Sequence, residues 1–195
     1  MQNKINLIIS QLGELRVKKD IDLRDYVQFN NDKKASAIFI ATSVSELSKA
    51  VSLCKELHVP YIVIGSGSKV VFKDPMFLGL VIKNRSQNLK IFGIKGQVSR
   101  AGIGIREAFI EADSGVILSD LFMFSDKQGL KGFDDLKTSK GTVGGSVFSN
   151  LSLIEKLTQI IVLDSQGSEK IRDSSDLSNQ DVILRAIFHL KAKEV

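Results

Sequence analysis

The strongest constraint on the fold is a strand, a helix and a strand that follow one another between residues 37 and 64. Residues 37–41 read AIFIA and residues 61–64 read YIVI, two short apolar runs that suit buried strands. Between them, Ser43 and Glu46 have the spacing of a capping box, in which the hydroxyl accepts from the Glu46 N–H and the carboxylate reaches back. The apolar residues that follow repeat at helical spacing: Leu47, Ala50, Val51, Cys54 and Leu57. Two strands joined by a helix of this length predict a βαβ crossover with parallel strands.

A Gly/Ser loop follows the second strand directly, because residues 64–69 read IGSGSK. Small residues let backbone N–H groups approach a ligand, and successive N–H groups in such a turn form an anion-binding nest. The loop lacks the Gly-Lys-Ser/Thr ending of a P-loop and the third glycine of the dinucleotide fingerprint. An ordinary flexible turn is the alternative, and for GSGS alone it is the better interpretation.

A second glycine-rich region lies later in the chain. Residues 129–136 read GLKGFDDL, residues 141–146 read GTVGGS, and Asn150 follows. The second turn opens what reads as a helix, and a helix N-terminus with glycines offers unpaired N–H groups to a phosphate or a ring edge. The alternative is a packing role, with glycines where two backbones touch.

The remaining pattern predicts an α+β fold rather than the steady alternation of a doubly wound sheet. Residues 1–20 are assigned to a leading amphipathic helix, residues 21–86 to a first lobe around the crossover, and residues 87–195 to a second lobe. The helix has apolar residues at helical spacing: Ile5, Ile8, Ile9, Leu12 and Leu15. Residues 17–36 read as polar and irregular.

Within the second lobe, residues 89–92 and 97–101 predict a hairpin that turns between Gly93 and Gly96. Further on, a helix ended by Gly115 is expected from the apolar residues Ile105, Ala108, Phe109 and Ala112. Strands are expected at residues 160–163 and 182–188.

Charge and cysteine usage narrow the class of protein. The net charge of +5 favours anionic ligands, but acidic and basic residues are mixed and no basic run interleaves with aromatic residues, so no nucleic-acid partner is expected. The single cysteine, Cys54, cannot form an internal disulfide, which fits a reducing compartment. No apolar run reaches the length of a membrane span, and no secretory signal pattern opens the chain. We therefore expect a cytoplasmic protein with no membrane partner.

Read in order, these segments resemble one enzyme family. Residues 64–69, with Asp74 and the glycine and strand at 79–82, resemble the GGGSN and D…G.VI stretches of the UDP-N-acetylenolpyruvoylglucosamine reductases (UDP-N-acetylmuramate dehydrogenases). Residues 101–104 resemble the family's AGAG, and residues 129–150 its GL.GLE.L.GIPGTVGGA…NAG stretch. Residues 171–174, IRDS, resemble its YRDS. Each match is weak, but the ordered set is specific.

The resemblance implies a PCMH-type FAD-binding fold, in which a small βαβ lobe and a second, mainly antiparallel lobe with flanking helices hold FAD between them. By position, the cofactor-binding residues of the first lobe would be Ile64, Gly65, Ser66, Gly67, Ser68 and Lys69. Those of the second lobe would be Gly141, Thr142, Val143, Gly144, Gly145 and Asn150.

Arg172 stands where the family has a catalytic arginine near the flavin and the substrate, and a fixed guanidinium could stabilise negative charge there. Without the resemblance, a surface ion pair with Asp173 or Glu169 would be the better interpretation.

In the family, NADPH reduces the flavin, and the flavin passes a hydride to the enolpyruvyl group of a UDP-sugar in peptidoglycan precursor synthesis. A serine that donates a proton and an assisting glutamate belong to a C-terminal substrate domain. We expect that domain to be absent, because the sequence stops at Val195, soon after the last matched strand.

The sequence departs from the family pattern around the reactive ring more than around the first loop. Lys69 replaces an asparagine, Ser139 and Lys140 replace Ile-Pro, and residues 151–155 replace a small AGAYG stretch. Ile171 replaces the tyrosine before Arg172. Three functions stay open: an FAD-binding flavoprotein domain that is incomplete for the family's reaction, a truncated or split reductase completed in trans by a separate substrate-domain protein, and a non-catalytic interaction protein that has lost FAD.

Overall fold

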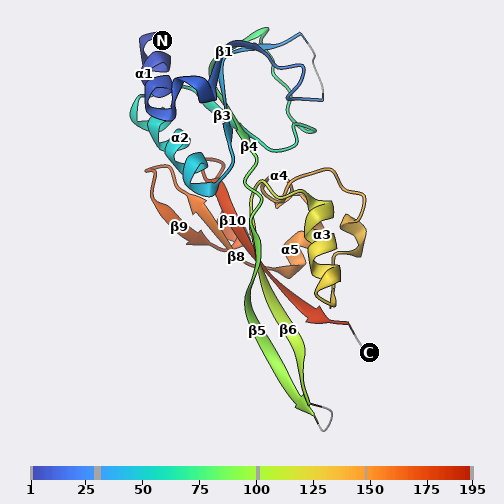
Figure 1. Ribbon diagram of the computed structural model, residues 1–195. Coiled ribbons are helices and arrows are strands. Elements are labelled where there is room, and N and C mark those ends of the chain that lie inside the picture. The colour runs from blue at the N-terminus through green and yellow to red at the C-terminus, as the bar shows by residue number, and fades with distance from the viewer. Residues whose placement is uncertain (1, 29–31, 100–101, 148, 194–195) are drawn as a thin grey trace.

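The computed structural model describes residues 2–28, 32–99, 102–147 and 149–193, which form two lobes (Figure 1). The first lobe contains a four-stranded sheet in the order β1-β2-β4-β3. Strands β2, β4 and β3 are parallel, and β1 is antiparallel to β2. The elements of this lobe are α1 (Gln2–Leu12), the short 3₁₀ turn η1 (Glu14–Arg16), β1 (Val17–Asp22), β2 (Lys34–Ala41), α2 (Val44–Glu56), β3 (Tyr61–Ile64) and β4 (Met76–Asn84).

The crossover from β2 through α2 to β3 is confirmed, although β4 lies between the two strands that α2 connects. The apolar face of α2 is buried where the periodicity predicts, and burial raises the pKa of the Cys54 thiol to about 12, as suits a core residue. The same core cluster contains residues of α1, β2 and β4 and also Ile161, Leu163 and Leu184 of the second lobe. Helix α2 is therefore packed between the two sheets, and the lobes share one core.

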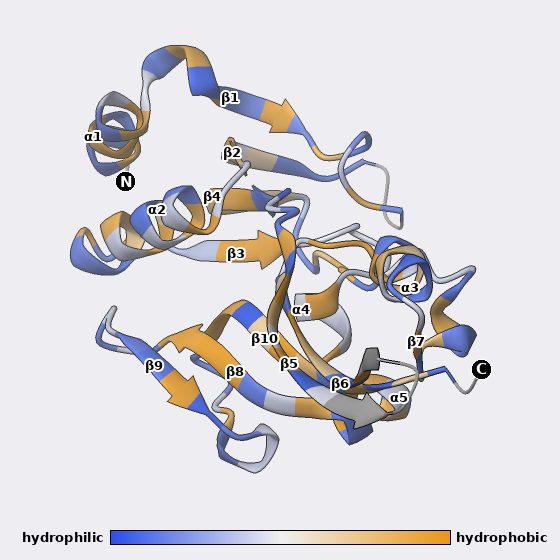
Figure 2. Ribbon diagram, turned by 60° about the horizontal axis from the view of Figure 1, so that its bottom comes forward, coloured by the Kyte–Doolittle hydropathy of each residue, from blue (hydrophilic) through white to orange (hydrophobic). Residues whose placement is uncertain are grey.

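The second lobe is built on an antiparallel sheet in the order β5-β6-β10-β8-β9, with β7 paired to the end of β10 (Figures 1 and 2). Helices α3, α4 and α5 cover the face opposite α2 (Figure 1). The elements are β5 (Leu89–Ser99), β6 (Gly102–Asp113), α3 (Leu118–Lys127), β7 (Leu130–Lys131), η2 (Asp134–Leu136), α4 (Val143–Ser146), α5 (Leu151–Lys156), β8 (Leu157–Leu163), β9 (Glu169–Arg172), η3 (Ser174–Asp176) and β10 (Val182–Ala192). None of the described helices is both long and apolar enough to cross a membrane.

The helix expected near residues 105–112 is wrong, because this segment is part of strand β6. Ala108, Ile110 and Ala112 are buried in one cluster, a period of two that the helical spacing had masked. Gly115 does not end a helix, because the element before it is strand β6, and a Cβ there would lie 2.5 Å from the Ser86 carbonyl oxygen.

The expected hairpin turn between Gly93 and Gly96 is also wrong. Strand β5 continues through both glycines, and the register shifts beside each of them, between Ile91 and Gly93 and between Lys95 and Gly96. The glycines therefore mark bulges, as glycine within a strand often does. Residues 17–22, expected to be irregular, form β1.

The start of α2 is fixed by a modified capping box. Ser43 Oγ accepts from the Glu46 N–H at 3.3 Å, but the Glu46 carboxylate accepts from the Thr42 N–H at 2.8 Å rather than from Ser43. Arg16 also donates to this carboxylate, with its two terminal nitrogens 2.5 and 3.0 Å from the two oxygens. These bonds lower the pKa of Glu46 to about 2, the Arg16 bond being the largest cause.

We predict that Glu46→Gln makes the protein's stability less dependent on pH in acid. Glu46 favours the folded state above its ordinary pKa of 4.5, and this contribution is lost as the pH falls from about 4.5 towards 2. Glu46→Gln should cost about 1 kcal/mol at pH 7 and converge with the wild type near pH 2. Urea unfolding at a series of pH values measures this, and parallel curves for the two proteins would contradict it.

Candidate functional site

A cavity of about 520 Å³ lies between the two lobes. Its first wall is β3 with Gly65 and Asn84, and its second wall comes from the segments 142–145 and 179–183. A smaller pocket of about 100 Å³ adjoins it and shares Val63, Gly65, Thr142 and Gly145 with it. The two therefore form one continuous site between the lobes.

The smaller pocket collects most of the residues predicted to bind the cofactor. It is lined by Ile64, Gly65, Ser66, Gly67, Ser68 and Lys69 of the first loop, and by Gly141, Thr142 and Gly145 of the second. Gly144 lines the larger cavity. Val143 instead points into the core and is fully buried, and Asn150 caps α5 by accepting from the Leu153 N–H at 3.1 Å.

The two loops touch because Gly65 has no side chain. A Cβ there would overlap the Thr142 side chain, lying 3.0 Å from Cγ2. Lys69 Nζ crosses between the lobes as well and donates to Ser149 Oγ at 3.0 Å. Gly67 has a φ of +81° and lies against the backbone of Tyr26, which leaves no room for a side chain. The path of the first loop thus depends on glycine at two positions.

The backbone donors of the second loop are already used within the protein, so the expectation of unpaired N–H groups at this helix start is wrong. Val143 N–H donates to Val116 O at 2.9 Å, Gly144 N–H to Ser114 O at 2.8 Å, and Gly145 N–H to Thr142 Oγ1 at 3.4 Å. These bonds hold α4 against the turn after β6, with a Cβ at Gly144 placed 2.9 Å from that of Ser114.

The first loop differs. Within the described part of the chain, no backbone N–H from Ser66 to Lys69 donates to a protein acceptor. Its side-chain hydroxyls, Ser66 Oγ and Ser68 Oγ, lie 3.0 Å apart. The path of this loop depends on glycines, it follows a parallel strand, and its backbone N–H groups meet no acceptor in the described structure. Such a loop is suited to hold a phosphate group.

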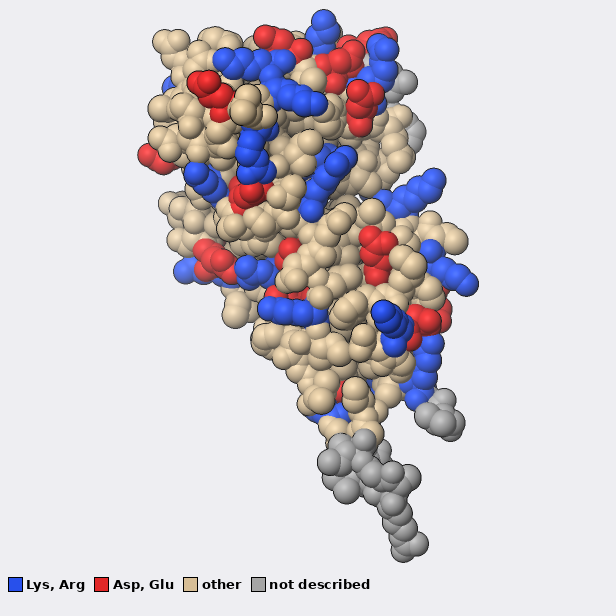
Figure 3. All heavy atoms as spheres, in the orientation of Figure 1, with Lys and Arg blue, Asp and Glu red and all other residues tan. Residues whose placement is uncertain are grey.

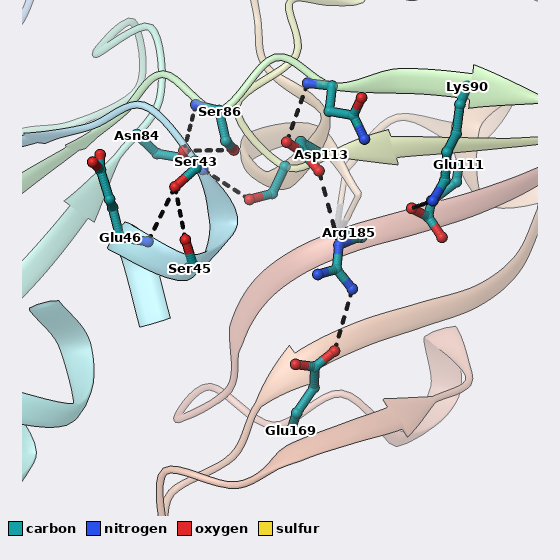
Figure 4. A network of polar contacts seen from close by, with 12 residues as sticks. Ser43, Ser45, Glu46, Asn84, Ser86, Lys90, Glu111, Asp113, Glu169 and Arg185 are labelled. Atoms are coloured by element: carbon teal, nitrogen blue, oxygen red, sulfur yellow. Dashed lines mark hydrogen bonds and ion pairs between the residues drawn. The ribbon is translucent and has the colours of Figure 1, made fainter. Parts of the chain in front are cut away.

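A buried polar network that includes two residues of the cavity lining joins the lobes (Figure 4). Asn84, at the end of β4, donates to Ser114 Oγ at 2.8 Å and accepts from Ser86 N–H and Oγ at 3.0 and 2.8 Å. Asn84 and Ser114 both line the cavity. Sequence reasoning missed Asn84, although a polar residue that ends a buried parallel strand is a usable signal for a site.

The same view shows Arg185 of β10 between two carboxylates (Figure 4). Its Nε lies 3.9 Å from Asp113 Oδ1, and its Nη1 lies 3.3 Å from Glu169 Oε1. Burial raises the pKa of Asp113, which also accepts from the Asn88 N–H at 3.1 Å. Glu169 thus pairs with Arg185, and among the described residues the ion pair of Arg172 is with Asp181 rather than with Asp173 or Glu169, the two partners that the sequence left open.

Arg172 does not line the cavity but contacts a residue that does. Its Nε is 3.6 Å from Oδ2 of Asp181, a carboxylate that lines the cavity and whose side chain is only 2% exposed. That Nε is buried without a hydrogen-bond partner in the described structure. Lys55, on the same wall, donates to the Asp164 carbonyl, and burial lowers its pKa. Among the described residues no group of His, Cys, Asp and Glu could hold a metal ion.

Comparison with known proteins identifies a domain family and relatives of this chain. A family model described as an FAD binding domain matches residues 35–156. The chain is 26% identical over 201 residues to the UDP-N-acetylenolpyruvoylglucosamine reductase of Clostridium beijerinckii, covering 95% of this chain and 62% of that protein. It is 28% identical over 188 residues to the enzyme of the same name from Caldicellulosiruptor bescii, covering 89% of this chain and 56% of that protein. The chain thus spans about three fifths of the length of these relatives.

Solved structures agree on the fold. The UDP-N-acetylenolpyruvylglucosamine reductase of Thermus caldophilus superposes with a TM-score of 0.69 at 20% identity, covering 92% of this chain and 64% of that one. p-Cresol methylhydroxylase superposes with a TM-score of 0.67 at 15% identity, covering 99% of this chain and 44% of that one. The expected α+β, PCMH-type fold is confirmed.

The family match runs from β2 through both glycine loops to the end of α5, so it includes both walls of the smaller pocket. The backbone donors of the first loop, which meet no acceptor among the described residues, and the missing side chains at Gly65 and Gly67 fit the diphosphate that FAD carries. FAD is the cofactor of this domain, which resembles the FAD-binding part of UDP-N-acetylenolpyruvoylglucosamine reductases, and the chain belongs to the FAD binding domain family.

Proposed function

We propose that this domain holds FAD between its lobes as the cofactor-binding part of a cytoplasmic reductase that uses NADPH and acts on UDP-N-acetylenolpyruvoylglucosamine. The observation that supports this most is the continuous site between the lobes, with Thr142 on one side and, on the other, first-loop backbone donors that have no acceptor in the described parts of the chain. FAD, once bound, supplies hydride transfer, which no amino-acid side chain can provide.

The residues of the chain bind and orient the cofactor in this proposal. The N–H groups of Ser66, Gly67 and Ser68 hold the diphosphate, and the Lys69 ammonium group adds charge at the same place. Gly141, Thr142, Gly144 and Gly145 form the opposite wall, while Ile64 supports the loop from the core. Val143 and Asn150 act indirectly, because they fix α4 and α5 in position.

Arg172 acts on the site through Asp181 in this proposal. The guanidinium group lies beside a nearly buried carboxylate of the cavity wall, so it holds segment 179–183 in place and neutralises the charge of Asp181. A direct contact with flavin or substrate, as the resemblance implies, would need Arg172 to leave this carboxylate.

FAD titration of the purified protein tests the proposed function. We expect FAD fluorescence to be quenched and the protein to be stabilised by about 2.7 kcal/mol when free FAD is 100 times its Kd. ADP should stabilise the protein as well, because it carries the diphosphate, whereas riboflavin should bind more weakly. If FAD leaves both fluorescence and melting temperature unchanged, the proposal is wrong and the protein has lost its cofactor.

A second candidate is a split reductase completed by a separate substrate-domain protein. It is favoured by Leu151 and Ile171, which are 75% and 66% exposed and stand where the family has small residues and a tyrosine. If a partner covers them, Leu151→Ser and Ile171→Ser should leave FAD affinity unchanged and abolish co-elution with that partner in size-exclusion chromatography. Unchanged co-elution would exclude this use of the two side chains.

A further inference from the structure

Lys83 is a buried lysine at the carboxyl end of the first-lobe sheet. Only 8% of it is exposed, and in the parallel strand pairs it lies directly between Ile40 of β2 and Ile64 of β3. Its side chain therefore shares a face of the sheet with Ile64, the residue from which the first loop starts. Lysine is almost never buried to this extent unless it has an ionic partner.

No such partner is present in the described structure, where Lys83 forms no ion pair with a carboxylate. Its Nζ donates to the backbone carbonyl of Tyr26 at 3.2 Å. Burial lowers the pKa of Lys83, and the nearby Arg85 lowers it further. A buried ammonium group that has only a carbonyl partner costs folding free energy. This cost points to an anion that is present only in the ligand-bound protein.

The Tyr26 carbonyl places this ammonium group behind the first loop. Gly67 lies against the same carbonyl oxygen, so closely that an added Cβ would overlap it, and Gln28 N–H donates to Gly67 O at 3.2 Å. Lys83 Nζ and Gly67 therefore both lie next to the Tyr26 carbonyl oxygen. Lys83 is only 8% exposed, and its strand neighbours Ile64 and Val81 belong to a buried apolar cluster, so dielectric screening between the charge and the loop is weak.

We propose that Lys83 is a buried counter-charge for the diphosphate of the cofactor, a positioning residue that acts through the Tyr26 segment and the loop of residues 65–69. This inference rests on the proposed function, because it takes the first loop as the diphosphate site. Lys83 raises the affinity for ligands that carry a diphosphate and leaves the affinity for an uncharged flavin unchanged. The energy needed to bury its charge in the free protein is offset when the anion binds.

Two variants test this, Lys83→Met, which removes the charge at similar length, and Lys83→Gln, which also keeps a donor for Tyr26. Lys18→Met is the matched control, because Lys18 is exposed on edge strand β1 of the same sheet and its loss changes the net charge equally. FAD, ADP and riboflavin affinities are measured for all proteins at low and high salt, together with the melting temperature of each apoprotein.

We expect both Lys83 variants to bind FAD and ADP about tenfold more weakly, about 1.4 kcal/mol, with riboflavin affinity unchanged and apoprotein melting temperatures equal to or above that of the wild type. Lys18→Met should match the wild type. Equal losses for FAD and riboflavin, or a lower melting temperature with the same loss, would show that Lys83 is only structural. Unchanged FAD affinity in both variants would also overturn the inference, whereas failure of the wild type to bind FAD would overturn the proposed function itself.

Discussion

The 195-residue chain alone is expected to bind FAD and yet to show no NADPH oxidation that depends on UDP-N-acetylenolpyruvoylglucosamine. Hydride transfer to the enolpyruvyl carbon leaves a carbanion-like centre that needs a proton, and general-acid help of this kind is worth about 10²–10⁴-fold. In the resembled family, the serine and the glutamate that give this help belong to the C-terminal substrate domain. Residues 1–195 of this chain do not match that domain. The surface that positions the sugar is in the same part, so the proximity contribution is lost as well.

The measurement is an NADPH oxidation assay with and without the sugar substrate, with the full-length reductase of Clostridium beijerinckii as the positive control. Slow oxidation without substrate is compatible with the prediction, since it needs only access to the flavin. Arg172 is not expected to supply the missing proton, because its guanidinium group lies beside Asp181 and does not line the cavity. Substrate-dependent turnover at an enzyme-like rate would show that residues assigned here to structure carry the chemistry.

The sequence predicted those parts of the fold in which local signals, such as helix capping, agree with the burial that tertiary packing requires. Helix α2 combines a capping residue, Ser43, with an apolar face that is needed at every third or fourth position, so no other element fits the pattern. The loop after β3 was found for a similar reason, because glycines at positions 65 and 67 exclude side chains at a point where two chain segments touch.

Strand β6 was missed because its burial is two-sided. Ala108, Ile110 and Ala112 pack into the second-lobe core, while Phe109 on the other face packs against the cluster around α2. Apolar residues on both faces remove the alternation that normally reveals a strand, and the remaining spacing imitates a helix. The pairings of β6 with β5 and with β10 decide between the two.

Only part of the site could be predicted, because the rest is formed by long-range contacts. The loop of residues 65–69 has a local signature, but the wall at 179–183 has none and joins the site only because β10 starts there. Lys83 and Asn84 follow the strand expected at residues 79–82 and were not predicted to belong to the site. Their roles depend on Tyr26 and Ser114, contacts that the sequence does not reveal.

Gly65→Ala is expected to weaken FAD binding through a contact between the lobes rather than through backbone strain. Gly65, unlike Gly67, does not have a positive φ, so the alanine backbone is allowed. Its Cβ would overlap Oγ1 of Thr142 and lie 3.0 Å from Cγ2, so the two loops must separate at the entrance of the smaller pocket. Overpacking of this kind costs about 1–3 kcal/mol, which corresponds to a loss of FAD affinity between about fivefold and 150-fold.

A second-site change provides the decisive control. Thr142→Ala removes both overlapping atoms and should cost about 1 kcal/mol by itself, because Thr142 Oγ1 caps α4. Added to Gly65→Ala, it should restore most of the lost affinity, a favourable coupling that a double-mutant cycle measures. Gly104→Ala should change nothing, since a Cβ there meets no atom within 4 Å. Additive losses in the double variant would mean that Gly65 and Thr142 do not form opposite walls of the FAD site, and the assignment of the second loop to the cofactor would then be wrong.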